Sequence, residues 1–400
     1  MMPGREPDPA DALKPLTTVE VDLGALARNV RALKGLLSGT TRLMAVVKAN
    51  AYGHGAVPVA RTALANGADF LAVARISEAA ELRKGGIDAP VLMFGVALPG
   101  HTAYMADHGI RASITDMAAA KILSQRLKTE GKTLKVHIKV DTGMGRLGLV
   151  HEAISAAPSS RAVDHILAIR AMDGLEVEGV YTHLSKADET DKTHTQEQIQ
   201  RFNRMIAQLA QKGFTPRICH AANSAGIIDL PESHFDMVRP GIAMYGLWPS
   251  DQVDRSRVSL APVMGIRSRL IQVKQVPKGF DVSYGATHVT SRPTTIATVP
   301  IGYADGYSRL LSNRGEMLVR GQRAKIAGRV CMDFTMIDVG HIPDAAPGDE
   351  VVIIGRQGDQ EILADHIAAH MNTINYEVTA GLTGRMSCRY LNPGEQHAQI

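Results

Sequence analysis

Residues capable of covalent, acid–base and anion-binding chemistry gather at the ends of short apolar runs in the first half of this sequence. A lysine amine can bond to a carbonyl group, a histidine can exchange protons, and arginines and glycine amides bind anions. The groups are Lys48 after the run 43–47, Lys139, Asp141 and Arg146 in the segment that closes the run 136–140, His183 and Asp188 after 177–182, Asn223 and Ser224 after 217–221, and Arg239, Pro240 and Gly241 after 237–238.

Each of these residues also has a structural explanation when it is taken singly. A lysine at a strand end is usually solvated, and a lone histidine is more often a hydrogen-bonded structural residue than a base. Ser224 lacks the G-x-S-x-G elbow of hydrolase nucleophiles, since its neighbours are Asn223 and Ala225. These explanations do not account for the placement that the groups share, so the pattern favours one common site.

The elements that would position these groups are eight apolar runs with helix-like segments between them. Buried parallel strands read as near-continuous apolar runs, so the pattern predicts an α/β fold that begins with an N-terminal (β/α)8 TIM-like barrel. In such a barrel the carboxyl ends of all strands lie on one face, so the chemical groups that follow the runs would lie together. A doubly wound open sheet fits the same spacing, because spacing alone does not close a sheet. The runs lie at residues 43–47, 70–74, 91–94, 110–114, 136–140, 177–182, 217–221 and 237–238, and helices are expected after Asp22 and at 76–83, 117–127 and 196–211.

The pattern changes after about residue 260. Segments of mixed or alternating polarity at 267–276, 295–300, 316–320, 323–330 and 351–355 are separated by glycine and proline turns, with one helix expected at 364–371. This half is expected to be mostly β. We therefore expect a flexible tail at 1–14, a barrel domain at 15–258 and a C-terminal β domain at 259–400.

Composition narrows the class of protein. The formal charge of +4 over 400 residues, without a dense basic run, argues against a nucleic-acid partner. No apolar stretch of membrane-spanning length is present, so no membrane partner is expected. The three cysteines are far apart and have no metal-ligand spacing, so no metal site is expected. Reduced cysteines and an N-terminus without an apolar signal region predict a cytoplasmic location.

The segment 46–55, which reads VVKANAYGHG, resembles the cofactor-attachment signature of the alanine racemase family. Further matching segments run in order along the chain, so the resemblance extends from about residue 17 to 389. It implies a pyridoxal-phosphate-binding barrel, a C-terminal β domain, and a homodimer with active sites at the subunit interface. The matching segments are 139–146, 179–183, 220–224, 238–242, 282–287, 301–306, 328–333 and 374–377.

The resemblance assigns the proton-transfer residues. Lys48 would hold pyridoxal 5′-phosphate covalently and, once freed, act as the base on one face of the substrate. Tyr284 of the partner subunit would serve the opposite face, with His183 beside it and Arg239 beside His183. A phenol is a weak base at neutral pH, so neighbouring groups must stabilise the ionised form of this tyrosine. Arg239 would face the pyridine nitrogen and keep it unprotonated, which favours proton exchange over decarboxylation or transamination.

The resemblance also assigns binding residues. The phosphate would lie among Tyr52, Ser224, Tyr376 and the backbone amides of Gly241 and Ile242, and Asn223 belongs to the same cofactor-binding set. Arg146 would contact the ring hydroxyl and take part in substrate binding, while Met332, Asp333 and Tyr303 would bind the substrate, with Asp188 also near its entrance. Lys139 matches a lysine that is carbamylated in some family members, where the added anion orients Arg146; a plain strand lysine near Asp141 is the alternative.

These assignments predict an isomerase that interconverts L- and D-alanine and supplies D-alanine for bacterial cell-wall peptidoglycan. A broad-specificity or serine-type racemase with the same machinery is the nearest alternative. A decarboxylase on the same barrel would need an acidic residue in place of Arg239. A non-catalytic cofactor-carrying barrel would lack the second half of the chain, where Tyr284 and Met332 are found.

Overall fold

The fold is seen in a computed structural model that describes residues 16–154 and 162–391. The expected tail at 1–14 lies outside the described residues. The chain divides into two compact units, one of residues 25–261 and one that joins the residues before 25 to those from 262 onward. No helix among the described residues is long and apolar enough to cross a membrane.

The first unit is a closed barrel of parallel strands. β2 pairs with both β3 and β10, and the ring closes where β5 pairs with β6. The barrel prediction is confirmed and the open sheet is excluded, because the ring leaves no free edge. In order around the ring, the strands are β2 (Arg42–Val46), β3 (Phe70–Val73), β4 (Val91–Val96), β5 (Ile110–Ile114), β6 (Leu134–Asp141), β8 (Leu175–Tyr181), β9 (Ile218–His220) and β10 (Met237–Val238).

Burial on both faces explains the apolar runs of the barrel strands. β3 is buried at every residue, and β6 is buried at all but one. Each predicted run coincides with one barrel strand. Because parallel strands all point the same way, the chemical groups that follow them are brought to one end of the barrel. The short strand β7 (Leu149–Val150) pairs with the end of β6 outside the ring.

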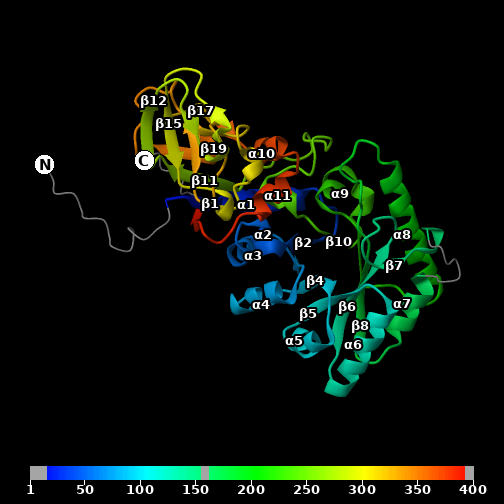
Figure 1. The fold of residues 1–400 in the computed structure, drawn as a ribbon. Helices are drawn as coiled ribbons and strands as arrows, with labels where there is room; N and C mark the ends of the chain where they lie inside the picture. Colours follow the sequence, from blue (N-terminus) through cyan, green and yellow to red (C-terminus); the bar gives the residue numbers. More distant parts are fainter. Residues whose placement is uncertain (1–15, 155–161, 392–400) are drawn as a thin grey trace. The chain divides into compact units, whose positions relative to one another are not determined.

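Helices connect the barrel strands and lie outside the ring (Figure 1). The helices expected at 76–83, 117–127 and 196–211 correspond to α4, α6 and α8, and the one expected after Asp22 is α1. The helices of this part are α1 (Leu23–Gly35), α2 (Lys48–Tyr52), α3 (Ala56–Ala65), α4 (Ile76–Lys84), α5 (Thr102–Asp107), α6 (Met117–Glu130), α7 (Ala162–Arg170), α8 (Thr193–Gln211) and α9 (Ser224–Asp229).

The second unit is built on a ten-stranded sheet and confirms the expected mostly β half. β11 alternates between buried and less buried residues, as the mixed polarity of its sequence indicates. The expected helix at 364–371 is α10 (Ala364–Met371), and α11 (Asn375–Ala380) follows it. The strands of this unit are β1 (Thr18–Asp22), β11 (Met264–Arg269), β12 (Gln272–Val276), β13 (Asp281–Val282), β14 (His288–Val289), β15 (Thr294–Val299), β16 (Glu316–Val319), β17 (Gln322–Ile326), β18 (Thr335–Asp338), β19 (Glu350–Gln357), β20 (Gln360–Ile362) and β21 (Ser387–Leu391).

The N-terminal strand β1 belongs to this second unit. It pairs antiparallel with β11 and parallel with β21, so it lies between two strands from the far end of the chain. The units therefore divide at Gly24/Ala25 and at Ala261/Pro262, whereas the sequence analysis placed the boundaries at 14/15 and 258/259. The difference at the N-terminal end arises because hydrogen bonds to β11 and β21 tie β1 to the β sheet.

Candidate active site

Lys48 lies where the chain leaves β2 and enters an unusual left-handed turn. Ala49, Asn50 and Ala51 have φ of 52°, 52° and 53° with ψ near 50°, and Tyr52 has φ of 54°. The left-handed conformation costs L-residues about 1–2 kcal/mol each. Such strain persists only where the surroundings over-determine the backbone, and it concentrates at functional sites.

Hydrogen bonds from three directions hold this turn. The Glu78 carboxylate accepts from the Ala49 amide at 2.7 Å, and the Asn50 side-chain oxygen accepts from the Ala56 amide at 2.9 Å. His54, fully buried, is 3.0 Å from the carbonyl oxygens of both Ala51 and Tyr52 through its Nδ1. The turn therefore fixes Lys48 and Tyr52 relative to the barrel end.

The Arg146 loop is organised by one carboxylate. Asp141 accepts hydrogen bonds from the amides of Gly143, Met144 and Gly145 at 2.9, 2.7 and 2.8 Å. Burial opposes the charge of Asp141, but these amides and the nearby Lys139 outweigh it and lower the pKa of the carboxyl group. A charged Asp141 thus holds the loop that carries Arg146.

Arg239 is the most buried cation of the barrel end, with 3% of its surface exposed. Its guanidinium donates to the carbonyl oxygens of Thr182 and Ala221 at 2.9 and 2.8 Å, and to the Nδ1 atoms of His183 and His220 at 3.1 and 2.8 Å. Because arginine can only donate, each of these Nδ1 atoms accepts. A neutral His183 therefore carries its proton on Nε2.

The electrostatics of the site are dominated by positive charge. Burial lowers the pKa of His183 well below its ordinary value, and Arg239, Lys139, Arg146 and Lys48 each lower it further. His183 is thus a neutral imidazole surrounded by four cationic side chains. Such a surplus of positive charge is suited to a ligand that carries phosphate or carboxylate groups.

The two lysines of this cluster are easier to deprotonate than free lysine. Burial and the neighbouring Arg146 lower the pKa of Lys48, against a smaller opposing effect of Glu78. Burial and Arg239 lower the pKa of Lys139 to about 7. A neutral amine is the form that bonds to a carbonyl carbon or to carbon dioxide, so both lysines are prepared for covalent chemistry.

Tyr52, Ser224 and Gly241 form a cradle for an anion. A methyl group at Gly241 would lie 2.6 Å from the Tyr52 hydroxyl, so only glycine lets the backbone come this close. The Ser224 hydroxyl accepts from the amides of Gly241 and Ala243 at 3.0 and 3.3 Å. Burial raises the pKa of Tyr52, so it stays a hydroxyl donor. The Tyr52 and Ser224 hydroxyls fit a phosphate group, whereas the Gly241 amide, expected to donate to it, donates to Ser224 in this structure; Ile242 starts the same turn.

Asn223 has a structural role in the described contacts. Its side-chain oxygen accepts from the Gly226 amide at 3.0 Å, which caps α9, and its side-chain nitrogen donates to the Leu184 carbonyl at 3.2 Å. Both interactions place Ser224 at the first residue of α9. Asn223 therefore acts on the cradle by fixing the backbone that carries Ser224.

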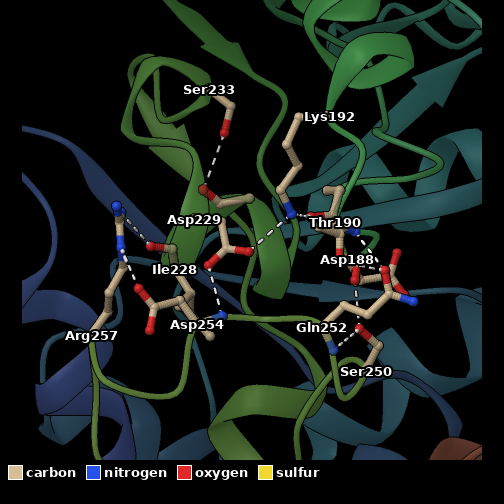
Figure 2. Close-up of polar contacts among 12 residues, drawn as sticks. Asp188, Thr190, Lys192, Ile228, Asp229, Ser233, Ser250, Gln252, Asp254 and Arg257 are labelled. Carbon is tan, nitrogen blue, oxygen red and sulfur yellow. Dashed lines mark hydrogen bonds and ion pairs between the residues drawn. The ribbon is translucent and has the colours of Figure 1, made fainter.

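Polar contacts beyond the site tie the segment after β8 to the segments that follow β9 and β10 (Figure 2). Lys192 donates to the Asp229 carboxylate at 3.0 Å, and the Ser250 hydroxyl donates to the backbone oxygen of Asp188 at 2.5 Å. Asp188, expected near a substrate entrance, takes part in these contacts through its backbone oxygen. The contacts stabilise the loop that follows His183 by tying it to the segments after β9 and β10.

The remaining predicted residues lie in the second unit. Tyr284 is 71% exposed on a turn in which Ser283 has φ of 67°, and the Ser283 hydroxyl donates to the Arg329 carbonyl at 2.7 Å. Met332 and Tyr303 are also exposed, at 53% and 42%. Tyr284, Tyr303 and Met332 are thus among the large apolar and aromatic side chains that this chain leaves exposed.

Two backbone hydrogen bonds join the segments that carry Tyr303 and Met332. The Tyr303 amide donates to the Cys331 carbonyl at 3.0 Å, and the Ala304 amide donates to the Met332 carbonyl at 3.0 Å. Asp333 follows Met332 and accepts from Arg385 at 2.7 Å. Tyr376, expected at the phosphate, is the second residue of α11 and is half-buried.

Sequence reasoning missed polar residues inside the barrel. His137 is fully buried in β6, and its Nε2 atom is 3.2 Å from the carboxylate of Glu178 on β8. The signal was a histidine in the run 136–140, which reads VHIKV, because a polar group in a buried strand needs a partner. Glu78, which holds the left-handed turn, stands in a helix of ordinary composition and gave no signal.

Comparison with known proteins assigns both parts of the chain to one family. A profile of the "Alanine racemase, N-terminal domain" matches residues 21–249, and a profile of the "Alanine racemase, C-terminal domain" matches residues 263–390. The alanine racemase of Desulfosudis oleivorans is 51% identical over 375 residues, which cover 93% of this chain and 96% of that protein.

Solved structures agree with the sequence comparison. An alanine racemase of Clostridium difficile 630 superimposes with a TM-score of 0.88 at 35% identity and covers 95% of this chain and 97% of that one. A histidine racemase of Leuconostoc mesenteroides superimposes with a TM-score of 0.84 at 28% identity, covering 94% and 98%. The fold is therefore shared by racemases that are named for different side chains.

Proposed function

The chain belongs to the alanine racemase family, and from this premise we propose that it is an amino-acid racemase that interconverts L- and D-alanine with pyridoxal phosphate attached to Lys48. The observation that carries the proposal is the barrel end, where Lys48 begins a strained turn near Arg146, and where Lys48, Arg146 and the buried Arg239 all lower the pKa of His183. The cradle of Tyr52, Ser224 and Gly241 fits the phosphate of this cofactor.

Lys48 supplies the base on one face of the substrate. When bound, pyridoxal phosphate makes the α-proton of an amino acid acidic through its conjugated ring. The lowered pKa of Lys48 increases the fraction of neutral amine at physiological pH, and only the neutral amine can accept that proton. The turn after Lys48 fixes the backbone from which its side chain reaches the barrel end, so the amine starts from one position.

Arg239 sets the type of reaction. Burial lowers the pKa of Arg239 to about 10, so the guanidinium stays charged at neutral pH and can only donate. A donor facing the pyridine nitrogen leaves that nitrogen unprotonated and weakens the ring as an electron sink. This favours proton exchange over decarboxylation, in which a carboxylate at this position would assist.

His183 prepares the second base. Because its Nδ1 atom accepts from Arg239, a neutral His183 presents an Nε2–H donor. Such a donor stabilises the ionised form of a phenol, which would make Tyr284 of the partner subunit a competent base on the other face. The two-base assignment of Lys48 and Tyr284 is part of the proposal.

We also propose that Lys139 is carbamylated and that the resulting anion orients Arg146. The support is its burial and the lowered pKa of about 7, which leaves neutral amine available to carbon dioxide at neutral pH. A charged lysine next to Arg239 and Arg146 would be repelled by both, and a carbamate would be attracted. Intact mass measured under gentle conditions should show one added carbon dioxide that is absent from Lys139→Met.

The exposed surface of Tyr284, Tyr303 and Met332 supports a homodimer in which each subunit completes the site of the other. Mixing inactive Lys48→Ala and Tyr284→Phe proteins tests this. If subunits exchange at random, about half of the dimers are mixed and each has one intact site, so about a quarter of the full activity should return. No recovery after verified subunit exchange would contradict shared sites.

The substrate is tested by racemisation assays across a panel of L- and D-amino acids. Alanine is expected to be the best substrate, and comparable rates with serine, histidine or other side chains would favour a broad-specificity or serine-type racemase instead. The proposed role in the cytoplasm is to supply D-alanine for peptidoglycan. Expression in a bacterium that requires D-alanine should restore growth without it, and failure with active protein would contradict that role.

A further inference from the structure

A continuous row of hydrogen bonds runs through the barrel interior from Arg239 to Glu178. The Arg239 guanidinium lies 2.8 Å from Nδ1 of His220, and Nε2 of His220 lies 2.8 Å from Nδ1 of His137. Nε2 of His137 lies 3.2 Å from the Glu178 carboxylate, which also accepts from Arg111 at 3.0 Å. All of these residues come from neighbouring strands of one half of the ring.

The chemistry of the end groups fixes the direction of every bond in this row. Arginine has no acceptor, so Nδ1 of His220 must accept and its ring proton must be on Nε2. That proton can only be donated to Nδ1 of His137, which places the His137 proton on Nε2, facing Glu178. The carboxylate accepts it, so both imidazoles are held in the Nε2–H tautomer.

The row also connects two opposite charges across neutral rings. Among the described contacts, Arg239 donates to two carbonyl oxygens and two histidines and lies over the Tyr181 ring, but it contacts no carboxylate. Burial opposes the charge of Glu178, but hydrogen bonds from His137 and Arg111 outweigh it and lower the pKa of this carboxyl group. Each imidazole directs its unprotonated nitrogen toward Arg239 and its N–H toward Glu178. The dipoles of the two rings therefore stabilise both charges.

The strands are shaped to hold this row. Gly179 is the register partner of His137 on β8, and a methyl group at Gly179 would lie 2.7 Å from Nδ1 of His137. The missing side chain therefore leaves the space that the His137 ring occupies. The Tyr181 ring, also on β8, stacks on His220 with centroids 4.7 Å apart and an interplanar angle of 4°.

We propose that His137 and Glu178 are positioning residues for Arg239: they hold the acceptor for the Nε2 proton of His220, and so keep the His220 ring where its Nδ1 atom accepts from the guanidinium that would face the cofactor's pyridine nitrogen. The meaning of that orientation rests on the proposed racemase function, whereas the hydrogen-bond row itself does not. Without the Glu178 carboxylate, His137 could carry its proton on Nδ1 instead, which would remove the acceptor for the His220 Nε2 proton and displace the His220 ring from Arg239.

The first test needs no substitution in the row. Nitrogen NMR of the ¹⁵N-histidine-labelled protein, with signals assigned through His137→Gln and His220→Gln, should show both rings protonated at Nε2 only. A His220 protonated at Nδ1, or on both nitrogens, at neutral pH would overturn the proposal. Since this measurement requires no amino-acid substrate, its result is independent of whether the chain racemises alanine.

The second test compares Glu178→Gln with Glu176→Gln, the same change on the same strand. At metal sites, loss of an outer hydrogen-bond partner of a ligand reduces activity about tenfold or more, and we take about tenfold as the expectation for this row. We expect that loss in the kcat of Glu178→Gln, with KM for alanine within about twofold and a shifted visible band of bound pyridoxal phosphate. Glu176→Gln should change neither quantity.

An unchanged kcat and an unchanged band in Glu178→Gln, with the His137 tautomer preserved, would also overturn the proposal. A loss of activity that is accompanied by equal losses in Glu176→Gln would do the same, because the effect would then not depend on the row. If the unaltered protein fails to racemise any amino acid, the proposed function fails and the NMR result alone decides whether the row exists.

Discussion

The two compact units carry their candidate site residues in opposite ways. In the barrel, Arg239, Lys139 and His220 are 3%, 4% and 0% exposed; Arg239 and His220 bond to each other, and the Lys139 amine donates to the Val140 carbonyl of its own strand. In the second unit, Tyr284 and Met332 are 71% and 53% exposed. The barrel residues are thus preorganised by the chain itself, whereas the side chains of the second unit are largely exposed in this chain.

This difference indicates how each half responds to substitution. A buried polar group that loses its partner leaves an unsatisfied group behind, which costs about 1–3 kcal/mol or more. An exposed side chain that is removed is replaced by water at little cost to folding. Substitutions in the barrel should therefore alter both stability and chemistry, and substitutions on the exposed surface should alter chemistry alone.

The largest expected effect is that of Lys48→Ala. Removing the amine removes both the attachment of the cofactor and one of the two bases, so racemisation should fall by at least about a thousandfold. The visible absorbance of the holoenzyme should be lost as well. Lys121→Ala, an exposed lysine on α6, is the matched control and should leave both readouts unchanged. Retained racemisation by Lys48→Ala would refute the assignment.

The next largest effect is expected for Tyr284→Phe, in the second unit, whose candidate site residues are exposed. Tyr284→Phe removes one hydroxyl from an exposed ring, so the free energy of unfolding should be unchanged. Proton removal should be impaired by about a hundredfold from one enantiomer and much less from the other, because each base serves one face. Deuterium exchange followed separately from L- and D-alanine measures this. Equal, small losses in both directions would contradict the two-base assignment.

The barrel could be predicted because its signal is local. Each buried parallel strand is a short apolar run, and the chemistry follows the run directly, as at Lys48 after β2. The strand β1 gave no comparable signal, since its five residues pair with β11 and β21, which lie more than two hundred residues away. A strand whose partners are that distant cannot be placed from its own sequence.

The part of the site that sequence could not predict depends on tertiary contacts. Ala49, Ala51 and Tyr52 have no preference for the left-handed conformation that they adopt. The Glu78 carboxylate on α4 accepts from the Ala49 amide and holds this conformation from outside the turn, while His54 adds local hydrogen bonds to Ala51 and Tyr52. His137 differs, because a histidine in an apolar strand was visible in the sequence, but its partner Glu178 could be identified only from the folded barrel.

A smaller effect comes from Lys139 and concerns stability. The pKa of Lys139 is about 7 in the folded chain, against about 10.5 in an unfolded chain. Between these values the unfolded state binds more protons, so the free energy of unfolding should rise with pH, by at most about 1.4 kcal/mol per unit. Denaturant unfolding between pH 7 and 10 in buffers free of carbon dioxide measures this rise.

Lys139→Met should lack this pH dependence, because the methionine side chain has a similar length and no charge. At pH 7 the variant should be at least as stable as the unaltered protein, since burial no longer opposes a partly charged amine. Parallel pH profiles for the two proteins would show that Lys139 is not the source of the rise, and would weaken the argument that its amine is available at neutral pH.

The smallest effect is expected at Arg385, the exposed counterpart of Arg239 in this comparison. Arg385 donates to Asp333 at 2.7 Å and lies 3.5 Å from Asp305, but its side chain is 49% exposed, so water screens both ion pairs. Arg385→Gln should therefore leave thermal stability unchanged and raise KM for alanine by no more than about fivefold, since backbone hydrogen bonds still hold the Tyr303 and Met332 segments together. A large loss of stability, or of kcat, would show that the exposed surface is organised by charge rather than by its backbone, and the contrast between the two units would then have to be abandoned.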